Sequence, residues 1–389
     1  MTHEPAPTED AADQERHATN LELFLDLVFV FAVTQITSIL GQDVSWAGVG
    51  RAALVAWLVW WQWSQFTWAG AAVDLQRRSA TRLLVLTTIP ATLVMVVSIP
   101  GAFTARAPWF GVAYMVVQLL VLAMQGSEAL KSPATRGAFL RYASIAAIAP
   151  VAVLVGALLG GDIRTAVWGG AALINIAGAL RGAAEGEWAI NPAHFAERHA
   201  LFVIIALGEV LVAVGATATE LGLSAEVLLG LGVAVSGACV IWWTYFAFIP
   251  NVAEHTLRAA SPAARGTLAR DLFTFGHFPI VAGIICYAVV VKHVVPHAAH
   301  APTVGDRALL GAAAGLVVGG FLHIQLRVVR ALAPERVAAI VVIAGWCAVS
   351  GALPGALVVG VAAAVLASMQ AVTWRRFRAG QLRHVSPNR

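Results

Sequence analysis

The stretch from Glu22 to Leu40, ELFLDLVFVFAVTQITSIL, is apolar enough to enter a lipid bilayer, yet it carries two acids near its start. A helix turns 100° per residue, so both acids fall on one stripe. That stripe consists of Glu22, Asp26, Phe29, Val33 and Thr37. A carboxylate inside a membrane span costs at least about 2.5 kcal/mol unless it meets a partner, a cavity or a proton. We therefore expect the stripe to face the protein interior, beside water or an ion path.

The composition of the whole chain indicates an integral membrane protein. Of its 389 residues, 59% are hydrophobic and only 12% are charged, and the mean hydropathy is +0.78. Soluble domains average about 25% charged residues, so folding alone cannot hide this much apolar surface from water. The apolar segments are about 18–23 residues long, which suits a hydrocarbon core about 30 Å thick. The ten-residue alternating strands of an outer-membrane barrel are not found in the sequence.

Hydropathy predicts an all-α polytopic protein with twelve membrane spans and short loops. Several loops contain turn signals, such as Pro100-Gly101 and Asn191-Pro192. The last two spans are expected to form either a hairpin that turns at Pro354-Gly355 or a re-entrant segment. The predicted spans cover residues 20–40, 49–70, 82–100, 107–126, 141–160, 165–182, 198–218, 226–248, 271–292, 307–326, 336–353 and 355–374.

The distribution of Lys and Arg favours an even number of spans with both termini in the cytoplasm. With twelve spans, 20 of the 25 basic residues fall on the side of the termini and five on the opposite side. Basic loops remain in the cytoplasm. Residues 1–19 hold five acids and no apolar signal sequence, which predicts a disordered acidic cytoplasmic tail. Residues 376–389 are predicted to be a basic cytoplasmic tail.

A faint internal repeat divides the chain into two halves. Arg16-His-Ala recurs at Arg198, and Trp60-Trp-Gln-Trp recurs in part at Trp242, both at a lag of 182 residues. Six spans is an even number, so the halves are predicted to be parallel six-helix units related by an axis along the membrane normal. The predicted halves are residues 20–190 and 191–375.

A further acid lies deep in the seventh predicted span. Glu209 is about twelve residues into that span, near mid-membrane, where an unpaired carboxylate is most costly. It is either an ion or proton site or a structural group bonded to a neighbouring helix. Asp26 has the same two interpretations, whereas Glu22 lies shallower and is typical of an interfacial or capping charge. Arg198 and His199 either reach the headgroups or pair with the acids of the first span.

The second span combines several tryptophans with two glutamines. Helix packing with interhelical amide hydrogen bonds is one interpretation. Trp60 and Trp61 lie near mid-span rather than at the interface that tryptophan prefers, so an aromatic-lined cavity is the other. The candidate lining residues are Trp60, Trp61, Gln62, Gln65, Trp242, Trp243 and Tyr245.

A histidine and a proline lie close together in the ninth span. Pro279 removes a backbone hydrogen bond and frees a carbonyl, and His277 can titrate near neutral pH. The sequence leaves two interpretations of His277 open: it either partners Glu209 or Asp26, or packs beside the helix kink.

No cofactor or metal site is predicted. His293, His297 and His300 have helix-like spacing, but Pro296 interrupts them and Asp306 is the one acid that follows nearby. The three cysteines lie in apolar spans, where they are expected to be small buried hydrophobes. The sequence contains no Walker loop, GxSxG elbow or HExxH motif. The net charge of +4 does not predict nucleic-acid binding, because the basic residues lie at span ends.

Four motifs of the chain, taken together, resemble those of a known family. They are Glu22-Leu-Phe-x-Asp26-Leu-Val-Phe-Val, Glu197-Arg-x-x-Leu-Phe-Val-Ile-Ile-x-Leu-Gly-Glu209, Trp242-Trp-x-Tyr-Phe246 and His277-Phe-Pro-Ile-Val-Ala-Gly283. Together they resemble the bacterial low temperature requirement protein A (LtrA) family, from about residue 16 to residue 375. Ala247 stands where that family often has an acid after its third motif. The resemblance implies a multi-pass protein of the bacterial inner membrane, linked by name to growth at low temperature.

The first motif also resembles, more distantly, the Phe-Ser-Asp motif on the first helix of the lysosomal-type potassium channels. Leu25 replaces the serine, and Asn20 stands where a basic residue is usual. Those channels are built from six-span units around a pore lined by the first helix. The resemblance therefore implies an ion path along the helix that carries Asp26, and a pseudo-fourfold homodimer.

These observations favour a membrane transport protein, channel or carrier, for a small cation or proton. One alternative is an intramembrane enzyme that acts on a lipid or isoprenoid substrate, with Glu209 and His277 as acid and base. Another is an accessory membrane protein whose buried acids only join helices. In the transport hypothesis the cation or proton binds Asp26, Glu209 and Glu22, whose charge is tuned by Arg198, His199 and His277.

Overall fold

The computed structural model describes residues 17–72, 79–184, 188 and 190–379, and this part of the chain is built from helices without a strand. The prediction of an all-α polytopic protein is confirmed. Most of the predicted acidic tail at residues 1–19, most of the predicted basic tail at residues 376–389, and Arg16 of the predicted repeat lie outside the described residues.

The helices follow the predicted spans closely. The first seven are α1 (Asn20–Gln42), α2 (Trp46–Ala72), α3 (Ser79–Val97), α4 (Ala107–Ala129), α5 (Pro133–Ala146), α6 (Ile148–Leu159) and α7 (Gly161–Ala184). The remainder are α8 (Pro192–Leu221), α9 (Ala225–Phe246), α10 (Ile249–Ala259), α11 (Pro262–Ala269), α12 (Gly276–Val294), α13 (Val304–Val329), α14 (Pro334–Val349) and α15 (Gly355–Arg378). Three short turns lie between them: η2 (Ile99–Gly101), η3 (Arg270–Phe275) and η4 (Val295–His297).

Nine helical segments in the described residues are long and apolar enough to cross a membrane. The other predicted spans are α2, which is rich in Trp and Gln, and the shorter helices α3 and α14. The fifth predicted span is divided into α5 and α6 because Pro150 has no N–H to donate to the carbonyl of Ala146. The last two predicted spans form a hairpin, in which the Trp346 indole donates to the carbonyl of Val358 at 3.0 Å.

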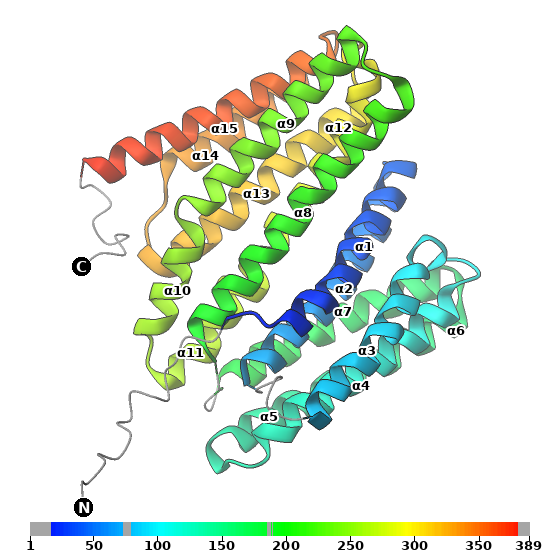
Figure 1. The fold of residues 1–389 in the computed structure, drawn as a ribbon, viewed down its shortest axis with the longest axis vertical. Coiled ribbons are helices and arrows are strands. Elements are labelled where there is room, and N and C mark those ends of the chain that lie inside the picture. Colours follow the sequence, from blue (N-terminus) through cyan, green and yellow to red (C-terminus); the bar gives the residue numbers. More distant parts are fainter. Residues whose placement is uncertain (1–16, 73–78, 185–187, 189, 380–389) are drawn as a thin grey trace, which may run out of the picture.

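The helices gather into two groups with a shared seam between them. Figure 1 shows α3 to α7 on one side and α9 to α11 with α13 to α15 on the other, while α1, α2, α8 and α12 form the seam. Contacts of α1 with α2, α3, α8 and α12 hold the seam together. The start of α1 and the end of α15 lie at the same end of the bundle, as an even number of passes requires (Figure 1).

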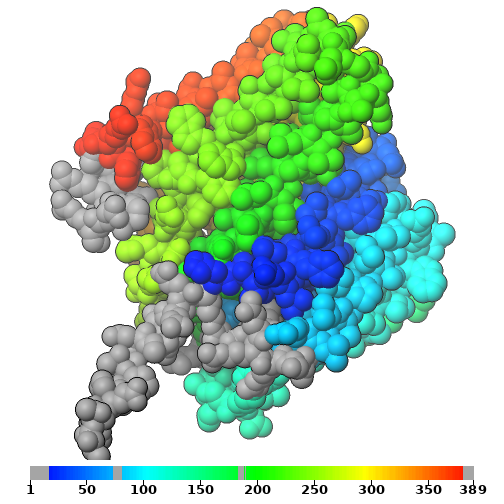
Figure 2. All heavy atoms as spheres, viewed as in Figure 1, coloured from blue at the N-terminus to red at the C-terminus, as the bar shows by residue number. Residues whose placement is uncertain are grey.

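One face of α1 is buried and the other is exposed. All five residues of the predicted stripe are at most 3% exposed. The opposite face is apolar and open, with Phe24 52% and Leu27 62% exposed, and Figure 2 shows α1 as a blue band across the surface. The acids of α1 therefore point into the protein, while the exposed face is suited to lipid or to another apolar surface.

Two details of the helices depart from expectation. Cys286 and Cys347 are buried as expected, whereas Cys239 lies on the exposed face of α9, and all three are free thiols. The two tryptophan-rich segments of the predicted repeat also differ in environment. Trp60 and Trp61 are buried, whereas Trp242 and Trp243 are about half exposed. A shared sequence pattern does not give these segments the same neighbours.

Glycines allow α12 and α13 to pack with their backbones in close approach. A Cβ atom on Gly283 would lie 2.7 Å from the carbonyl oxygen of Ala313, and one on Gly320 would lie 2.5 Å from Ile280 Cγ1. Real Cβ contacts are not this short, so any larger residue would push the two helices apart.

We expect Gly283→Val to lower the free energy of unfolding by about 1–3 kcal/mol, because α13 backbone occupies the space of the new side chain. Thermal unfolding in detergent measures the loss. Gly315→Ala on α13 is the matched control, since its Cβ would meet nothing within 4 Å. A Gly283→Val protein as stable as the wild type would contradict this close packing.

Candidate functional site

The first turns of α1 and α8 lie side by side and are joined through buried charged groups. Glu22 Oε1 lies 2.8 Å from His194 Nε2. The Asp26 carboxylate accepts from both terminal nitrogens of Arg198, with Nη2 2.8 Å from Oδ1. The indole of Trp63 on α2 donates to the same Oδ1 atom at 3.0 Å. Arg198 is fully buried, so this bidentate pair satisfies a charge that has no contact with water.

Local sequence fixes the start of each helix and thereby brings these groups together. Thr19 and Glu22 form a capping box at the start of α1. Asn191 caps α8 by accepting a hydrogen bond from the backbone N–H of His194. The contacts between the two helices join residues 172 to 175 positions apart. This nearly constant separation means that α1 and α8 run parallel and in register.

Glu209 lies farther along the same seam and has a different partner. Its Oε2 atom is 2.5 Å from the Thr34 hydroxyl of α1, and the Glu209 residue is 7% exposed. Thr34 Oγ1 is also 3.4 Å from the carbonyl of Val30. The hydroxyl can donate to a carboxylate, or donate to Val30 and accept from a protonated carboxyl. Within the described residues Glu209 forms no ion pair, and Thr34 is its side-chain hydrogen-bond partner.

An apolar layer separates the Asp26 and Glu209 sites. Phe29 and Val33 of α1 fill it from one side, and Phe202 and Ala206 of α8 from the other. These four residues are at most 2% exposed. The structure therefore places the sequence-predicted acids of α1 and α8 in two separate sites on one seam, rather than in one site.

The two predicted histidines form an aromatic layer behind Arg198. The rings of His199 and His277 are 5.0 Å apart, and the ring of Trp63 lies 5.0 Å from His199. His277 Nε2 is 2.8 Å from the Tyr245 hydroxyl, and its Nδ1 is 2.9 Å from the carbonyl of Leu272. His277 thus packs beside the helix kink, the second of the two interpretations that the sequence allowed.

The structure does not pair His277 with either acid. Neither Glu209 nor Asp26 is among its hydrogen-bond partners in the described residues. The acid–base pair that a lipid-directed enzyme would need is therefore not assembled from Glu209 and His277.

An irregular turn supplies backbone acceptors to this layer. η3 is a π-helical turn before α12, and Pro279 follows it without an N–H to donate. The carbonyl of Thr274 accepts from the Trp60 indole at 2.9 Å, and the carbonyl of Asp271 lies 3.0 Å from His323 Nε2. Side chains from two other helices, α2 and α13, thus use carbonyls that a regular helix would keep for itself.

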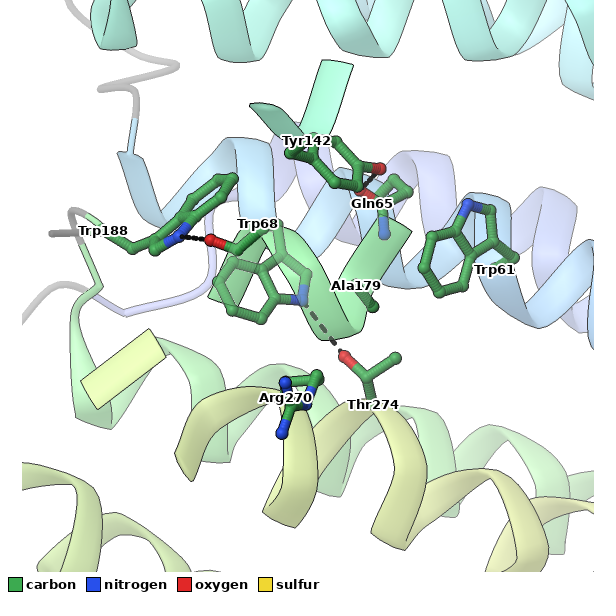
Figure 3. A pocket seen from close by; sticks show the side chains of 9 residues that line it. Trp61, Gln65, Trp68, Tyr142, Ala179, Trp188, Arg270 and Thr274 are labelled. Carbon is green, nitrogen blue, oxygen red and sulfur yellow. Dashed lines mark hydrogen bonds between the residues drawn. The ribbon is translucent and has the colours of Figure 1, made fainter. Parts of the chain in front are cut away.

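A small cavity of about 30 Å³ lies at the end of α2 next to η3. Figure 3 shows three indoles around it, with Arg270 and Thr274 below Trp68. The Trp68 indole donates to Thr274 Oγ1 at 3.1 Å, and the Tyr142 hydroxyl lies 2.5 Å from Gln65 Oε1. The lining residues are Trp61, Gln65, Trp68, Tyr142, Ala179, Gly182, Trp188, Arg270 and Thr274.

Two of the predicted lining residues, Trp61 and Gln65, contribute to this cavity. Gln62 instead donates to the carbonyl of Tyr114 at 3.2 Å. Trp242 and Trp243 lie instead about half exposed on α9, because hydropathy does not reveal which face of that helix is covered by protein. Sequence reasoning missed the cavity's other lining residues, because they come from helices that become neighbours only on folding.

A wider pocket of about 400 Å³ opens at the opposite end of α12. There His293 Nδ1 lies 2.7 Å from Asp306 Oδ1, and the Thr303 hydroxyl is 2.6 Å from Asp306 Oδ2. His293, His297 and His300 all line this pocket. The described residues contain no group of three or more His, Cys, Asp or Glu side chains that could hold a metal ion.

Comparison with known proteins places the chain in a family. The family model of the bacterial low temperature requirement A protein matches residues 17–371. The chain belongs to the LtrA family. An uncharacterized protein of Rhizobium meliloti (strain 1021) is 33% identical over 282 residues, which cover 69% of this chain and 67% of that protein. No solved structure matches the chain. The resemblance seen in the four motifs is thereby confirmed.

All four LtrA motifs meet at the seam. The first and second are joined by Asp26 and Arg198, and again where Glu209 meets Thr34 just beyond the first motif. The third and fourth are joined by Tyr245 and His277. Stacking of His199 against His277 connects the two pairs of motifs. The family signature therefore describes one connected interior site rather than four independent segments.

We expect Asp26→Asn to destabilise this LtrA-family protein by about 3–5 kcal/mol, because it leaves the buried Arg198 guanidinium without a counter-charge. Unfolding in detergent measures the effect, and a double-mutant cycle with Arg198→Met tests its origin. The double variant should lose much less stability than the sum of the two single losses. Additive losses would contradict a direct ion pair.

Proposed function

We propose that this LtrA-family protein transports a small cation or a proton across the bacterial inner membrane, with Glu209 as the group that binds and releases it. The environment of Glu209 is the observation that supports this proposal. It lies deep within a span and has only the neutral Thr34 hydroxyl as a hydrogen-bond partner in the described residues. A carboxyl group there needs a proton or a cation to offset the cost of burial.

The other acids of the seam are suited to a fixed role. Asp26 is held by Arg198 and Trp63, and Glu22 by His194 and the helix cap. A carboxylate that already has a bidentate guanidinium partner has little to gain from a transported cation. We assign Asp26, Glu22 and Arg198 to holding α1 against α8, and His199 and His277 to packing around Arg198.

Polar groups extend from Glu209 towards the end of α1. Thr37 lies one turn beyond Thr34, is 1% exposed, and its hydroxyl has no hydrogen-bond partner in the described residues. Gly41 then approaches His293, which lines the 400 Å³ pocket. Thr37 and His293 could therefore bind a cation or proton in turn as it moves between Glu209 and the membrane side opposite the termini.

The apolar layer favours a carrier over a permanently open channel. An ion released from Glu209 towards Asp26 would have to cross Phe29 and Phe202 without a polar contact. A rearrangement of α1 against α8 would open that side, as alternating access requires. The binding groups point into one chain, so the path would run through each subunit, with both termini cytoplasmic. A homodimer, through the exposed face of α1, stays a prediction.

We expect purified protein in proteoliposomes to carry ion flux, and Glu209→Gln to reduce it by at least about tenfold because the amide cannot exchange a proton or neutralise a cation. A potassium gradient with an internal pH-sensitive dye, with and without a protonophore, separates proton movement from cation movement. Glu220→Gln, at the exposed end of the same helix, is the matched control and should retain flux.

Thr34→Val should lower flux less than Glu209→Gln does, because it removes the partner and leaves the carboxyl group in place. Equal flux in wild type and Glu209→Gln would overturn the role of Glu209. If folded wild-type protein, inserted in the vesicles in both orientations, carries no protons, potassium or sodium, ion transport is overturned. The hypotheses of a lipid-directed enzyme and of an accessory membrane protein would then remain.

A further inference from the structure

A second polar region lies between α2, α4 and α5, apart from the contacts of α1 with α8. It contains amide and phenol side chains and no acidic or basic residue. Each member is at most 4% exposed. The members are Gln62 and Gln65 on α2, Tyr114, Gln118 and Gln125 on α4, and Tyr142 on α5. We call these six residues the amide cluster.

Some atoms of the amide cluster bond to one another. Gln65 Oε1 is 3.2 Å from Gln125 Nε2 and 2.5 Å from the Tyr142 hydroxyl. Asn175 of α7 donates to the Tyr114 hydroxyl at 3.3 Å. The cluster therefore reaches from the cavity at Gln65 to the middle of α7.

Other atoms of the amide cluster have no partner. The oxygens of Gln62 and Gln125, and both the oxygen and the nitrogen of Gln118, are buried without a hydrogen bond in the described residues. Buried polar groups are almost always paired with protein or ordered water. Exchanging the amide oxygen and nitrogen of Gln118 does not help, because both of its positions lack a partner. Four unpaired amide atoms along the contact between α2 and α4 therefore indicate an occupant.

The free atoms define the chemistry of that occupant. They include three acceptor oxygens and one amide donor, so the occupant must both donate and accept hydrogen bonds. A buried ion would need a counter-charge among these side chains. Arg270, at the neighbouring cavity, is already paired with Asp271 at 2.6 Å. The occupant is therefore neutral.

The space beside the cluster indicates its size. Gln65 and Tyr142 line the cavity of about 30 Å³ (Figure 3). That is room for about two water-sized molecules, since one occupies about 10–15 Å³ by this measure. Water is the neutral molecule that fits both the hydrogen-bonding pattern of the unpaired amides and the size of the cavity that Gln65 and Tyr142 line. Gln62, Gln118 and Gln125 are not among the lining residues of that cavity.

We propose that the amide cluster is a hydration site, in which internal water molecules bridge Gln62, Gln118 and Gln125 and extend from the cavity at Gln65 towards Tyr114. This site is separate from Glu209 and does not depend on the transport proposal. It would give the first helices an uncharged hydrogen-bonding interior, in contrast to the charged seam between α1 and α8.

X-ray hydroxyl-radical footprinting tests the proposal on the full-length protein in detergent. Radicals form from bound water, so a buried tyrosine is labelled within milliseconds only where ordered water touches it. The chain has four tyrosines. Tyr287 is the control, because it is 5% exposed and its hydroxyl already donates to the carbonyl of Ala234. We expect severalfold more labelling of Tyr114 and Tyr142 than of Tyr287.

Gln118→Met keeps the side-chain length and removes both unpaired amide atoms. We expect it to reduce the labelling of Tyr114 and Tyr142 and to lower Tm, because the bridging water loses its partners. Labelling of both tyrosines no higher than that of Tyr287, or a rise in Tm of Gln118→Met, would show a dry cluster and overturn the proposal. If Gln118→Met does not fold, Gln62→Met provides the same comparison, and the wild-type labelling still decides.

Discussion

The bidentate pair of Arg198 with Asp26 is the interaction on which the rest of the seam depends. A guanidinium with no contact with water is stable inside a membrane protein only beside its counter-charge. This requirement fixes the register of α1 against α8, and it leaves Glu209 opposite Thr34 farther along. Trp63 binds the same carboxylate, so α2 is tied to the pair as well. The positions of three helices thus follow from one buried charge and its neutralisation.

The seam separates two roles that acids can have in a membrane. Near one end, carboxylates with basic partners hold helices together. Nearer the middle, Glu209 has a hydroxyl partner that accommodates either protonation state. Phe29 and Phe202 keep the two regions apart, so charge in one is poorly hydrated from the other. Under the proposed function, this separation would let Glu209 bind and release an ion without weakening the helix contacts near Asp26.

Irregular backbone and uncharged amides add further polar character to the interior. Carbonyls released at η3 and before Pro279 accept side-chain hydrogen bonds from other helices. Such irregular backbone is tolerated at membrane depth only where protein covers it, and α2, α8 and α13 provide that cover here. The amide cluster has four buried amide atoms without a partner in the described residues, and the proposed internal water would satisfy them.

The sequence by itself determined the membrane class, the all-α fold, the approximate span limits, the inward face of α1 and the family. These features follow from hydropathy, charge bias and helical periodicity, which act within about twenty neighbouring residues. It also identified Asp26, Arg198 and Glu209 as charged residues in membrane spans, where burial is costly without a partner. Only the tertiary structure decided their partners, the outward position of Trp242 and Trp243, and the cavity beside Arg270. Partners such as Thr34 and Glu209 are 175 residues apart, so the pairing depends on how helices pack and not on any local pattern.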